Sequence, residues 1–312
     1  MRTLLFALVA LLLTTSCNDA IKNPNPKVDV EPGTEVVQNN TESVASSRTT
    51  PNESHIGNYV GWFNMANLSD NHDKVITADE AFYWARENKI NIAIDSVSTD
   101  AVYGHSVVAG NQRPFTGHVQ DNVYRVREPG DHKYDGAFEW VIQDNDTMIG
   151  TWEAYNNIEI KNRKYKLART DFEYNADQML DQYSEYVDWN KYTSTTETNE
   201  IDGEPYDWEY REFATATDAI HELNGSNKVL TKADVENLKR GDLIIIRNMI
   251  YARHGYSFKK RPLRVFFDEQ DWYVPVYNDI RDNLTDIEKQ NIQLLLSYEE
   301  NAAEYYDYFG RG

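Results

Sequence analysis

Residues 56–170 are dominated by short runs in which apolar or β-branched residues alternate with polar or small ones. The clearest run is Lys89–Val97, where Ile90, Ile92 and Ile94 share one face, as the two-residue period of a β-strand requires. Seven further runs predict strands at Asn58–Phe63, Ala101–Val108, Phe115–Gln120, Asn122–Arg127, Gly136–Gln143, Thr147–Tyr155 and Lys164–Ala168. Because strands spaced about 8–12 residues apart without helices between them are typical of meanders, we expect an antiparallel β-barrel or β-sandwich.

One stretch within this region has a helical pattern instead. Ala78–Asn88 places Phe82, Trp84 and Ala85 among charged residues, and it predicts a helix that interrupts the meander. Near the end of the region, Gly150-Thr151-Trp152 resembles the Gly-x-Trp of lipocalin-like barrels. That resemblance implies a lipocalin-like barrel.

A helical period replaces the strand period near the C-terminus. Thr231 is a predicted N-cap of a short helix that Gly241 ends. Asp242 is the predicted cap of a second helix over Leu243–His254, whose first turn is apolar on every side and therefore buried. Gly255 supplies the left-handed residue that ends this helix. These signals predict a small helical domain over residues 227–300, and the whole chain is expected to be α+β.

An acidic and aromatic connector, residues 171–226, joins the two regions. Its segment 171–213 has 13 acidic residues and two basic ones, together with six Tyr, two Trp and two Phe. Within it, Tyr183–Trp189 predicts an amphipathic helix and Tyr192–Gly203 a loop. A solvated linker rarely contains this many aromatic side chains. We therefore expect the connector to pack on one of the two domains.

The charge of the chain excludes one class of function. The 312 residues include 51 acidic and 31 basic ones, which gives a formal net charge of -20. A nucleic acid is a polyanion and is repelled by a protein with this net charge, so we expect no nucleic-acid partner. More than half of the net charge lies in segment 171–213, which carries -11, so the remaining regions can still meet an anionic surface.

The N-terminus has the layout of a targeting segment. The apolar run Leu4–Leu13 is too short to cross a membrane, which needs about 20 residues, but it suits the hydrophobic region of a signal peptide. Thr14-Thr15-Ser16 and then Cys17 resemble the lipobox of bacterial lipoproteins. The resemblance implies a signal peptide at 1–16, a lipid on Cys17 and a lipid-anchored envelope protein, with the outer membrane as the expected location. Residues 17–55 lack aromatic residues and predict a disordered tether.

The C-terminal region also resembles a known family. Tyr251-Ala252-Arg253-His254-Gly255 is the naming motif of the YARHG-domain family, and Trp272-Tyr273 and Asn283–Ile292 follow in the same order. The resemblance implies a small helical domain of bacterial envelope proteins, often lipoproteins, with no established enzymatic activity. Thr285 and Glu288 form a predicted capping box for a last helix to about residue 300, and residues 301–312 are a tail.

No catalytic or metal-binding set can be assembled by spacing. The seven histidines include no helical metal-ligand pair, the only cysteine is Cys17, and no nucleotide or hydrolase motif occurs. We therefore expect no catalytic residues, no metal and no cofactor. His254 is interpreted as a helix-end residue packed inside the domain, since a catalytic role requires a nucleophile or carboxylate partner that spacing does not reveal.

One cluster of charges offers a binding surface. Residues 243–267 contain six basic residues and no acidic one: Arg247, Arg253, Lys259, Lys260, Arg261 and Arg264. The leading hypothesis is a noncatalytic binding or scaffolding protein that contacts an anionic cell-wall or lipopolysaccharide-type polymer through this cluster. Alternatively, the cluster is a solvated loop or docks on the acidic connector. The sequence also allows a β-barrel carrier of a small apolar or glycan ligand, or an envelope hydrolase of unrecognised type.

Overall fold

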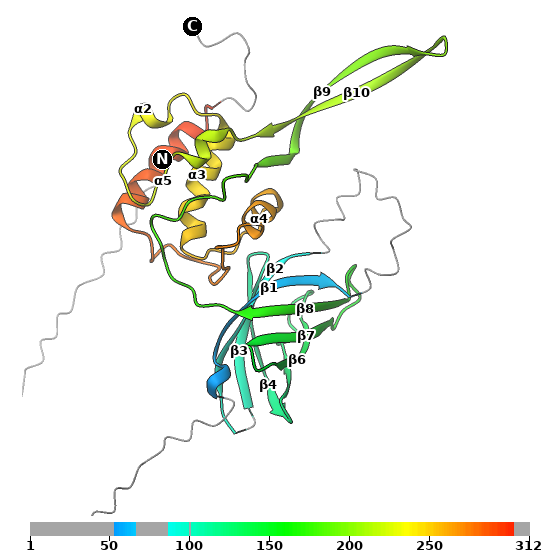
Figure 1. Ribbon diagram of the computed structural model, residues 1–312, viewed down its shortest axis with the longest axis vertical. Coiled ribbons are helices and arrows are strands. Elements are labelled where there is room, and N and C mark those ends of the chain that lie inside the picture. Colours follow the sequence, from blue (N-terminus) through cyan, green and yellow to red (C-terminus); the bar gives the residue numbers. More distant parts are fainter. Residues whose placement is uncertain (1–52, 67–86, 100, 303–312) are drawn as a thin grey trace, which may run out of the picture. The chain divides into compact units, whose positions relative to one another are not determined.

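The computed structural model describes residues 53–66, 87–99 and 101–302 (Figure 1). The signal peptide, Cys17 and most of the tether lie outside the described residues, as do most of the predicted helix Ala78–Asn88 and most of the tail. After a 3-10 turn at Glu53–His55, the described chain has eight strands, a long hairpin and a small helical region. The α+β fold is therefore confirmed.

The first eight strands close into an antiparallel barrel. They are β1 (Gly57–Met65), β2 (Lys89–Val97), β3 (Ala101–Val108), β4 (Asn111–Gln120), β5 (Val123–Arg127), β6 (Gly136–Ile142), β7 (Thr147–Ala154) and β8 (Asn162–Arg169). Each strand pairs with its neighbours in sequence, and β1 also pairs with β8, so that Tyr59 lies opposite Arg169 and Met65 opposite Arg163. All eight predicted strands are present, and the closing pair makes the sheet a barrel and not a sandwich.

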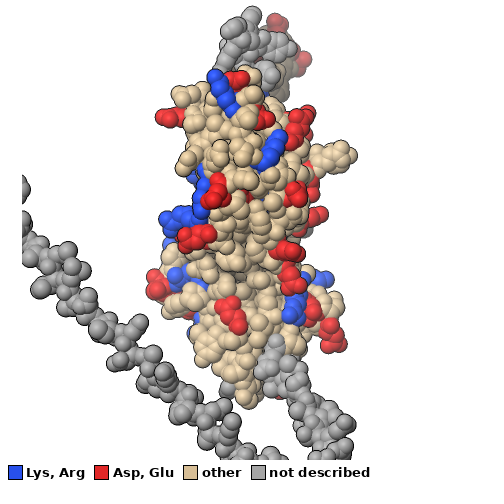
Figure 2. All heavy atoms as spheres, turned by 90° about the vertical axis from the view of Figure 1, so that its left-hand side faces the viewer, with Lys and Arg blue, Asp and Glu red and all other residues tan. Residues whose placement is uncertain are grey.

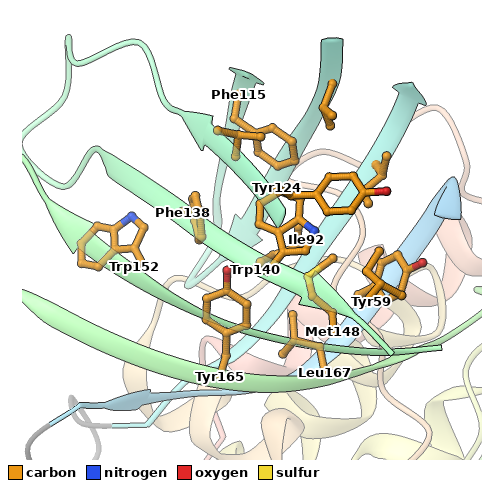
Figure 3. Close-up of a cluster of buried hydrophobic side chains, with 14 of the residues drawn as sticks. Tyr59, Ile92, Phe115, Tyr124, Phe138, Trp140, Met148, Trp152, Tyr165 and Leu167 are labelled. Carbon is orange, nitrogen blue, oxygen red and sulfur yellow. The ribbon is translucent and has the colours of Figure 1, made fainter. Parts of the chain in front are cut away.

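Aromatic and branched side chains fill most of the barrel. Ile90, Ile92 and Ile94 of β2 all point inward and are almost fully buried, as their alternation predicts. Figure 3 shows Ile92 inside the barrel together with aromatic side chains of the other strands, among them Tyr124 and Trp140. Tyr124 and Trp140 stack with ring centroids 5.4 Å apart and 7° between their planes. Gly150 and Trp152 of the lipocalin-like tripeptide lie on β7, and Trp152 belongs to this core.

The connector contains a β-hairpin that the sequence did not suggest. Strand β9 (Val187–Ile201) pairs in antiparallel register with β10 (Glu204–Thr215), and the two form a long separate ribbon (Figure 1). The predictions of a helix at Tyr183–Trp189 and a loop at Tyr192–Gly203 are therefore wrong over the residues of β9. Asp202 and Gly203 both have positive φ, as a two-residue hairpin turn requires.

Four helices form the C-terminal region. They are α2 (Lys232–Val235), α3 (Arg240–Arg253), α4 (Arg261–Asp268) and α5 (Asp286–Glu299), preceded by a 3-10 turn at Asp218–His221. The contacts between α3 and α5 form the centre of a second hydrophobic core, which includes Leu243, Ile246 and Leu295. The Thr285–Glu288 capping box and the left-handed Gly255, with φ of 71°, are as predicted.

Two details of the helices differ from prediction. Helix α3 begins at Arg240, so Asp242 lies in its first turn and accepts a hydrogen bond from the Lys239 backbone N–H. Gly241 lies inside this helix, where a Cβ would come 2.5 Å from the Thr215 carbonyl oxygen, so close approach of β10 explains the glycine. Helix α4 was not predicted. Pro262 lies in its first turn, where proline favours the start of a helix, but a proline in the sequence is also typical of a loop.

Polar contacts join the barrel to the helical region. The Lys89 backbone N–H donates to Oδ2 of Asp268 at 3.1 Å, and its Nζ donates to the carbonyl of Gln270 at 2.7 Å. The Gly110 N–H donates to Oγ of Ser257 at 2.9 Å. These bonds place the start of β2 and the β3–β4 turn against α4 and the loops that flank it. No helix among the described residues is long and apolar enough to span a membrane.

Candidate functional site

A pocket of about 440 Å³ lies at the end of the barrel where odd-numbered strands finish and even-numbered strands begin. Its aromatic and aliphatic lining comes from Phe63, Val108, Phe138, Trp152, Ile158 and Ile160. Its polar lining comes from Asn88, Ser106, Asn111, Glu128, Lys133, Tyr134, Glu159, Arg163 and Arg264. We call it the barrel-mouth pocket. The barrel is thus filled through most of its length, and it offers space for a small molecule at this end.

The buried carboxyl of Glu128 lies at the inner wall of the barrel-mouth pocket. Ser106 Oγ donates to its Oε1 at 3.0 Å, and the Gly136 N–H and Trp152 Nε1 donate to its Oε2 at 2.7 and 3.4 Å. Burial raises the pKa of Glu128 from its ordinary 4.5 to about 7, although these hydrogen bonds act in the opposite direction. Near neutral pH this carboxyl can therefore either donate or accept a hydrogen bond.

Two guanidinium groups face the barrel-mouth pocket. Arg163 of β8 lies over the Phe63 ring, 5.0 Å from its centroid, and donates to the Phe63 carbonyl at 2.7 Å. Burial, together with the positive charge of Arg264, lowers the pKa of Arg163 to about 10. Burial also lowers the pKa of Arg264, which no hydrogen bond or ion pair of its side chain joins to another described residue. Two like charges on one half-buried wall favour an anion between them.

This arrangement suits binding better than catalysis. Phe63, Phe138 and Trp152 can pack against an apolar or aromatic body, and the two arginines can hold one anionic group. Among the described residues, no histidine or cysteine lines the pocket. In the part of the chain that is described, no group of three or more His, Cys, Asp or Glu side chains is placed to hold a metal ion.

The YARHG motif itself is part of the second core. Arg253 is buried, and its guanidinium donates to the Gln178 carbonyl from Nε at 2.8 Å and to Ser226 Oγ at 3.1 Å. Burial lowers the pKa of Arg253 to about 10. The half-buried ring of Tyr251 packs on that of Tyr256, with centroids 6.1 Å apart. In this arrangement Arg253 anchors the connector to α3.

His254, the next residue of the motif, has a carboxylate partner. Its Nε2 lies 2.8 Å from Oε2 of Glu288, and both side chains are buried. Burial would raise the pKa of Glu288, but hydrogen bonds, first of all from His254, lower it to about 2. The Tyr174 ring stacks on His254 at 4.2 Å and its hydroxyl donates to Glu288 at 3.0 Å. The neighbours of His254 in the motif, Ala252, Arg253 and Gly255, are buried as well, as expected of a helix end packed inside the domain.

Sequence reasoning did not find Glu288 as this partner. The two residues are 34 positions apart, so no helical or strand spacing relates them. The only sequence signal at Glu288 was the capping box, in which its carboxylate accepts a hydrogen bond from the Thr285 N–H at 2.9 Å. A carboxylate can accept several hydrogen bonds, so this role leaves room for His254 as a further donor. The two residues form a His–carboxylate pair, and both side chains are buried within the packed core.

The six predicted basic residues do not form one surface. Arg253 is buried, Arg264 lines the barrel-mouth pocket, and Lys259 lies against Gly110 of the β3–β4 turn. On the face drawn in Figure 2, basic and acidic side chains are interspersed, without a continuous basic area. Arg247, Lys260 and Arg261 line a different cavity.

That second cavity is a groove of about 610 Å³ between the base of β9 and helices α3, α4 and α5. Its basic lining residues are Lys191, Arg240, Arg247, Lys260 and Arg261, and its acidic ones are Asp188, Glu299 and Glu300. Arg247 holds Glu299 through two hydrogen bonds, of 2.8 and 3.1 Å. Lys260 and Arg261 have no such partner among the described residues. We call this cavity the basic groove.

A closed eight-stranded antiparallel barrel followed by a small helical domain defines the class of the described chain. The model of the YARHG domain family matches residues 220–300, so the C-terminal helical region is a YARHG domain. No curated protein and no solved structure matches the chain. A YARHG domain together with a β-barrel fits a binding protein of the cell envelope.

Proposed function

We propose that the protein is a lipid-anchored, noncatalytic binding protein of the bacterial envelope. Its barrel-mouth pocket takes a small molecule with an apolar or aromatic body and one anionic group. The observation that supports this proposal best is the pair of half-buried guanidiniums, Arg163 and Arg264, on the wall of a pocket floored by Phe63, Phe138 and Trp152. Because Arg163 belongs to the barrel and Arg264 to the YARHG domain, the ligand contacts both.

Binding of a fluorescent aromatic anion, anilinonaphthalene sulfonate, tests the pocket. Arg264→Met keeps most of the apolar stem and removes the charge, so we expect at least about tenfold weaker binding. Arg261→Met is the matched control, since Arg261 begins the same helix but lines the basic groove. The neutral N-phenylnaphthylamine should bind both variants and the natural chain alike. Equal binding of the anion by the Arg264 variant and the natural chain would contradict the proposal.

The lipid anchor on Cys17 is a separate part of the proposal. It is supported by the single cysteine after an apolar run of ten residues and by the YARHG domain, whose family resemblance implies envelope proteins. Mass spectrometry of the mature N-terminus tests it. A diacylglycerol-modified Cys17 at the first position is expected, and an unmodified start at any other residue would contradict it.

The basic groove favours a second candidate function, contact with an anionic envelope polymer. Lys260 and Arg261 stand at its rim without an ion-pair partner in the described chain, beside the cationic Arg240 and Arg247. Cosedimentation with cell-wall fragments and, separately, with lipopolysaccharide tests this role across a salt series. The double variant Lys260→Met/Arg261→Met should bind less, and Lys232→Met/Lys289→Met, which removes two exposed charges elsewhere, should not. Equal losses in both variants would show only a response to net charge.

A further inference from the structure

An aromatic row runs along one face of the β9–β10 hairpin. Tyr206, Trp208 and Tyr210 alternate along β10 with Asp207 and Glu209, so the three rings share one face. The rings of Tyr206 and Trp208 are in edge contact, with centroids 5.1 Å apart, which agrees with that alternation. Across the ladder, Asn199, Glu197 and Thr195 lie opposite the three rings and belong to the same face.

This aromatic row is open to solvent. Tyr206, Trp208 and Tyr210 are 51 %, 46 % and 53 % exposed, although each carries a large apolar ring. A two-stranded ribbon buries neither of its faces by itself and is at best marginally stable in water. Contiguous exposed aromatics of this kind mark interaction surfaces, because Tyr and Trp offer large contact areas at low entropic expense.

The charge of the hairpin selects the kind of partner. Strands β9 and β10 with their turn carry eight acidic residues (Asp188, Glu197, Glu200, Asp202, Glu204, Asp207, Glu209 and Glu212) against Lys191 and Arg211. Glu197 and Glu212 lie on the aromatic face itself. Anionic polymers, nucleic acids and a second hairpin are repelled by this charge, whereas cations are attracted to both the carboxylates and the ring faces.

The chain itself contains contacts between an arginine and an aromatic ring, the kind of contact that a cationic partner would make with this row. On the opposite face of the same hairpin, the guanidinium of Arg211 lies over the Tyr192 ring at 5.0 Å. In the YARHG domain, Arg247 lies near the Tyr251 ring at 5.9 Å. Arginine is the better residue for this contact because its planar group both stacks on a ring and bonds a carboxylate.

We propose that the aromatic face of the β9–β10 hairpin is a docking surface for a cationic, arginine-rich protein segment. The rings of Tyr206, Trp208 and Tyr210 stack against its guanidinium groups, and Glu197 and Glu212 accept hydrogen bonds from them. This surface is separate from the barrel-mouth pocket and the basic groove, since none of these five residues lines either.

Fluorescence anisotropy of a labelled octa-arginine peptide against the full chain tests the proposal. The triple variant Tyr206→Ser/Trp208→Ser/Tyr210→Ser keeps the charge and removes the rings, and we expect it to bind at least about tenfold more weakly. The matched control is Ser194→Ala/Thr196→Ala/Thr198→Ala on the opposite face, which should bind like the natural chain. Glu197→Gln/Glu212→Gln should weaken binding and reduce its salt dependence. Octa-glutamate should not bind.

Three outcomes would overturn the proposal. The first is octa-arginine binding that is equal in the triple variant and the natural chain, which would show attraction to the acidic charge alone. The second is an equal loss in the opposite-face control. The third is self-association in sedimentation velocity that the triple variant abolishes, because the occupant would then be a second copy. Circular dichroism and thermal unfolding of each variant show that the barrel and the helices stay folded.

Discussion

His254 Nε2 and Glu288 Oε2 lie 2.8 Å apart inside the YARHG domain, joining the end of α3 to the start of α5. Removing one member of a buried pair leaves the other without its partner, which typically destabilises a protein by about 3–5 kcal/mol. We therefore expect His254→Ala to lower the free energy of unfolding by an amount in that range, measured by urea denaturation at pH 7. The exposed His132→Ala is the control and should change it little. A loss below about 1 kcal/mol would contradict a structural role for this pair.

Arg253→Lys is expected to destabilise the YARHG domain. Arg253 reaches both Gln178 and Ser226 with different nitrogen atoms, and a single ammonium group cannot reproduce this fork. A loss of about 1–3 kcal/mol in the free energy of unfolding is expected, because a buried carbonyl or hydroxyl loses its donor. Binding of cell-wall fragments per folded molecule should stay unchanged, since only 2 % of the Arg253 surface is exposed. Weaker polymer binding at full stability would instead make Arg253 a ligand contact.

Glycine at position 255 is expected to be required by both backbone and packing. Its φ is 71°, and a Cβ there would come 2.9 Å from the Phe172 ring and 3.1 Å from the Val274 carbonyl oxygen. Gly203 at the hairpin tip also has a positive φ, of 84°, but has nothing within 4 Å of a Cβ. Both alanine variants incur the left-handed strain of about 1–2 kcal/mol, so thermal unfolding should show a larger loss for Gly255→Ala. Equal losses would mean that Phe172 moves aside freely.

Glu128 is expected to make stability fall as the pH rises. Its pKa is raised to about 7 in the folded protein from an ordinary 4.5, so between these values the unfolded chain releases this proton first. The resulting loss is on the order of 3 kcal/mol, complete above pH 7 and absent below pH 4.5. Glu128→Gln should remove this part of the pH dependence in urea denaturation, whereas the exposed Glu139→Gln should not. Parallel pH profiles of the natural chain and the Glu128 variant would contradict the raised pKa.

The strands were predictable where strongly apolar residues recur at every second position. Ile90, Ile92 and Ile94 gave such a period and point into the barrel core, although Asn91 and Ala93 between them are also buried. Tyr206, Trp208 and Tyr210 alternate equally well, but both faces of their hairpin meet solvent, so acidic composition concealed the period. A pattern of burial cannot identify a strand that buries neither face.

The sequence predicted that basic residues line the binding sites, but it did not predict which of them lie close together in space. The basic residues of segment 243–267 are close in sequence, yet α3 and α4 direct Arg253 inward, Arg264 to the barrel and Arg261 to the basic groove. Arg163 comes from β8 and joins Arg264 only through the contact of barrel and helices. Such meetings depend on tertiary packing between segments far apart in the sequence, which local periods do not encode.

Closure of the barrel has a consequence for how copies of this chain meet. Because β1 pairs with both β2 and β8, the barrel strands have both edges occupied, and the open edges in the described ranges belong to β9 and β10. An open edge is a template for strand addition and cross-β aggregation, which natural proteins suppress with charge. Glu200 lies on β9 and Glu209, which pairs with Arg211, lies on β10, and we expect their charges to disfavour pairing with strands of neighbouring copies. Loss of these charges in strong acid would therefore turn the hairpin into the first point of aggregation.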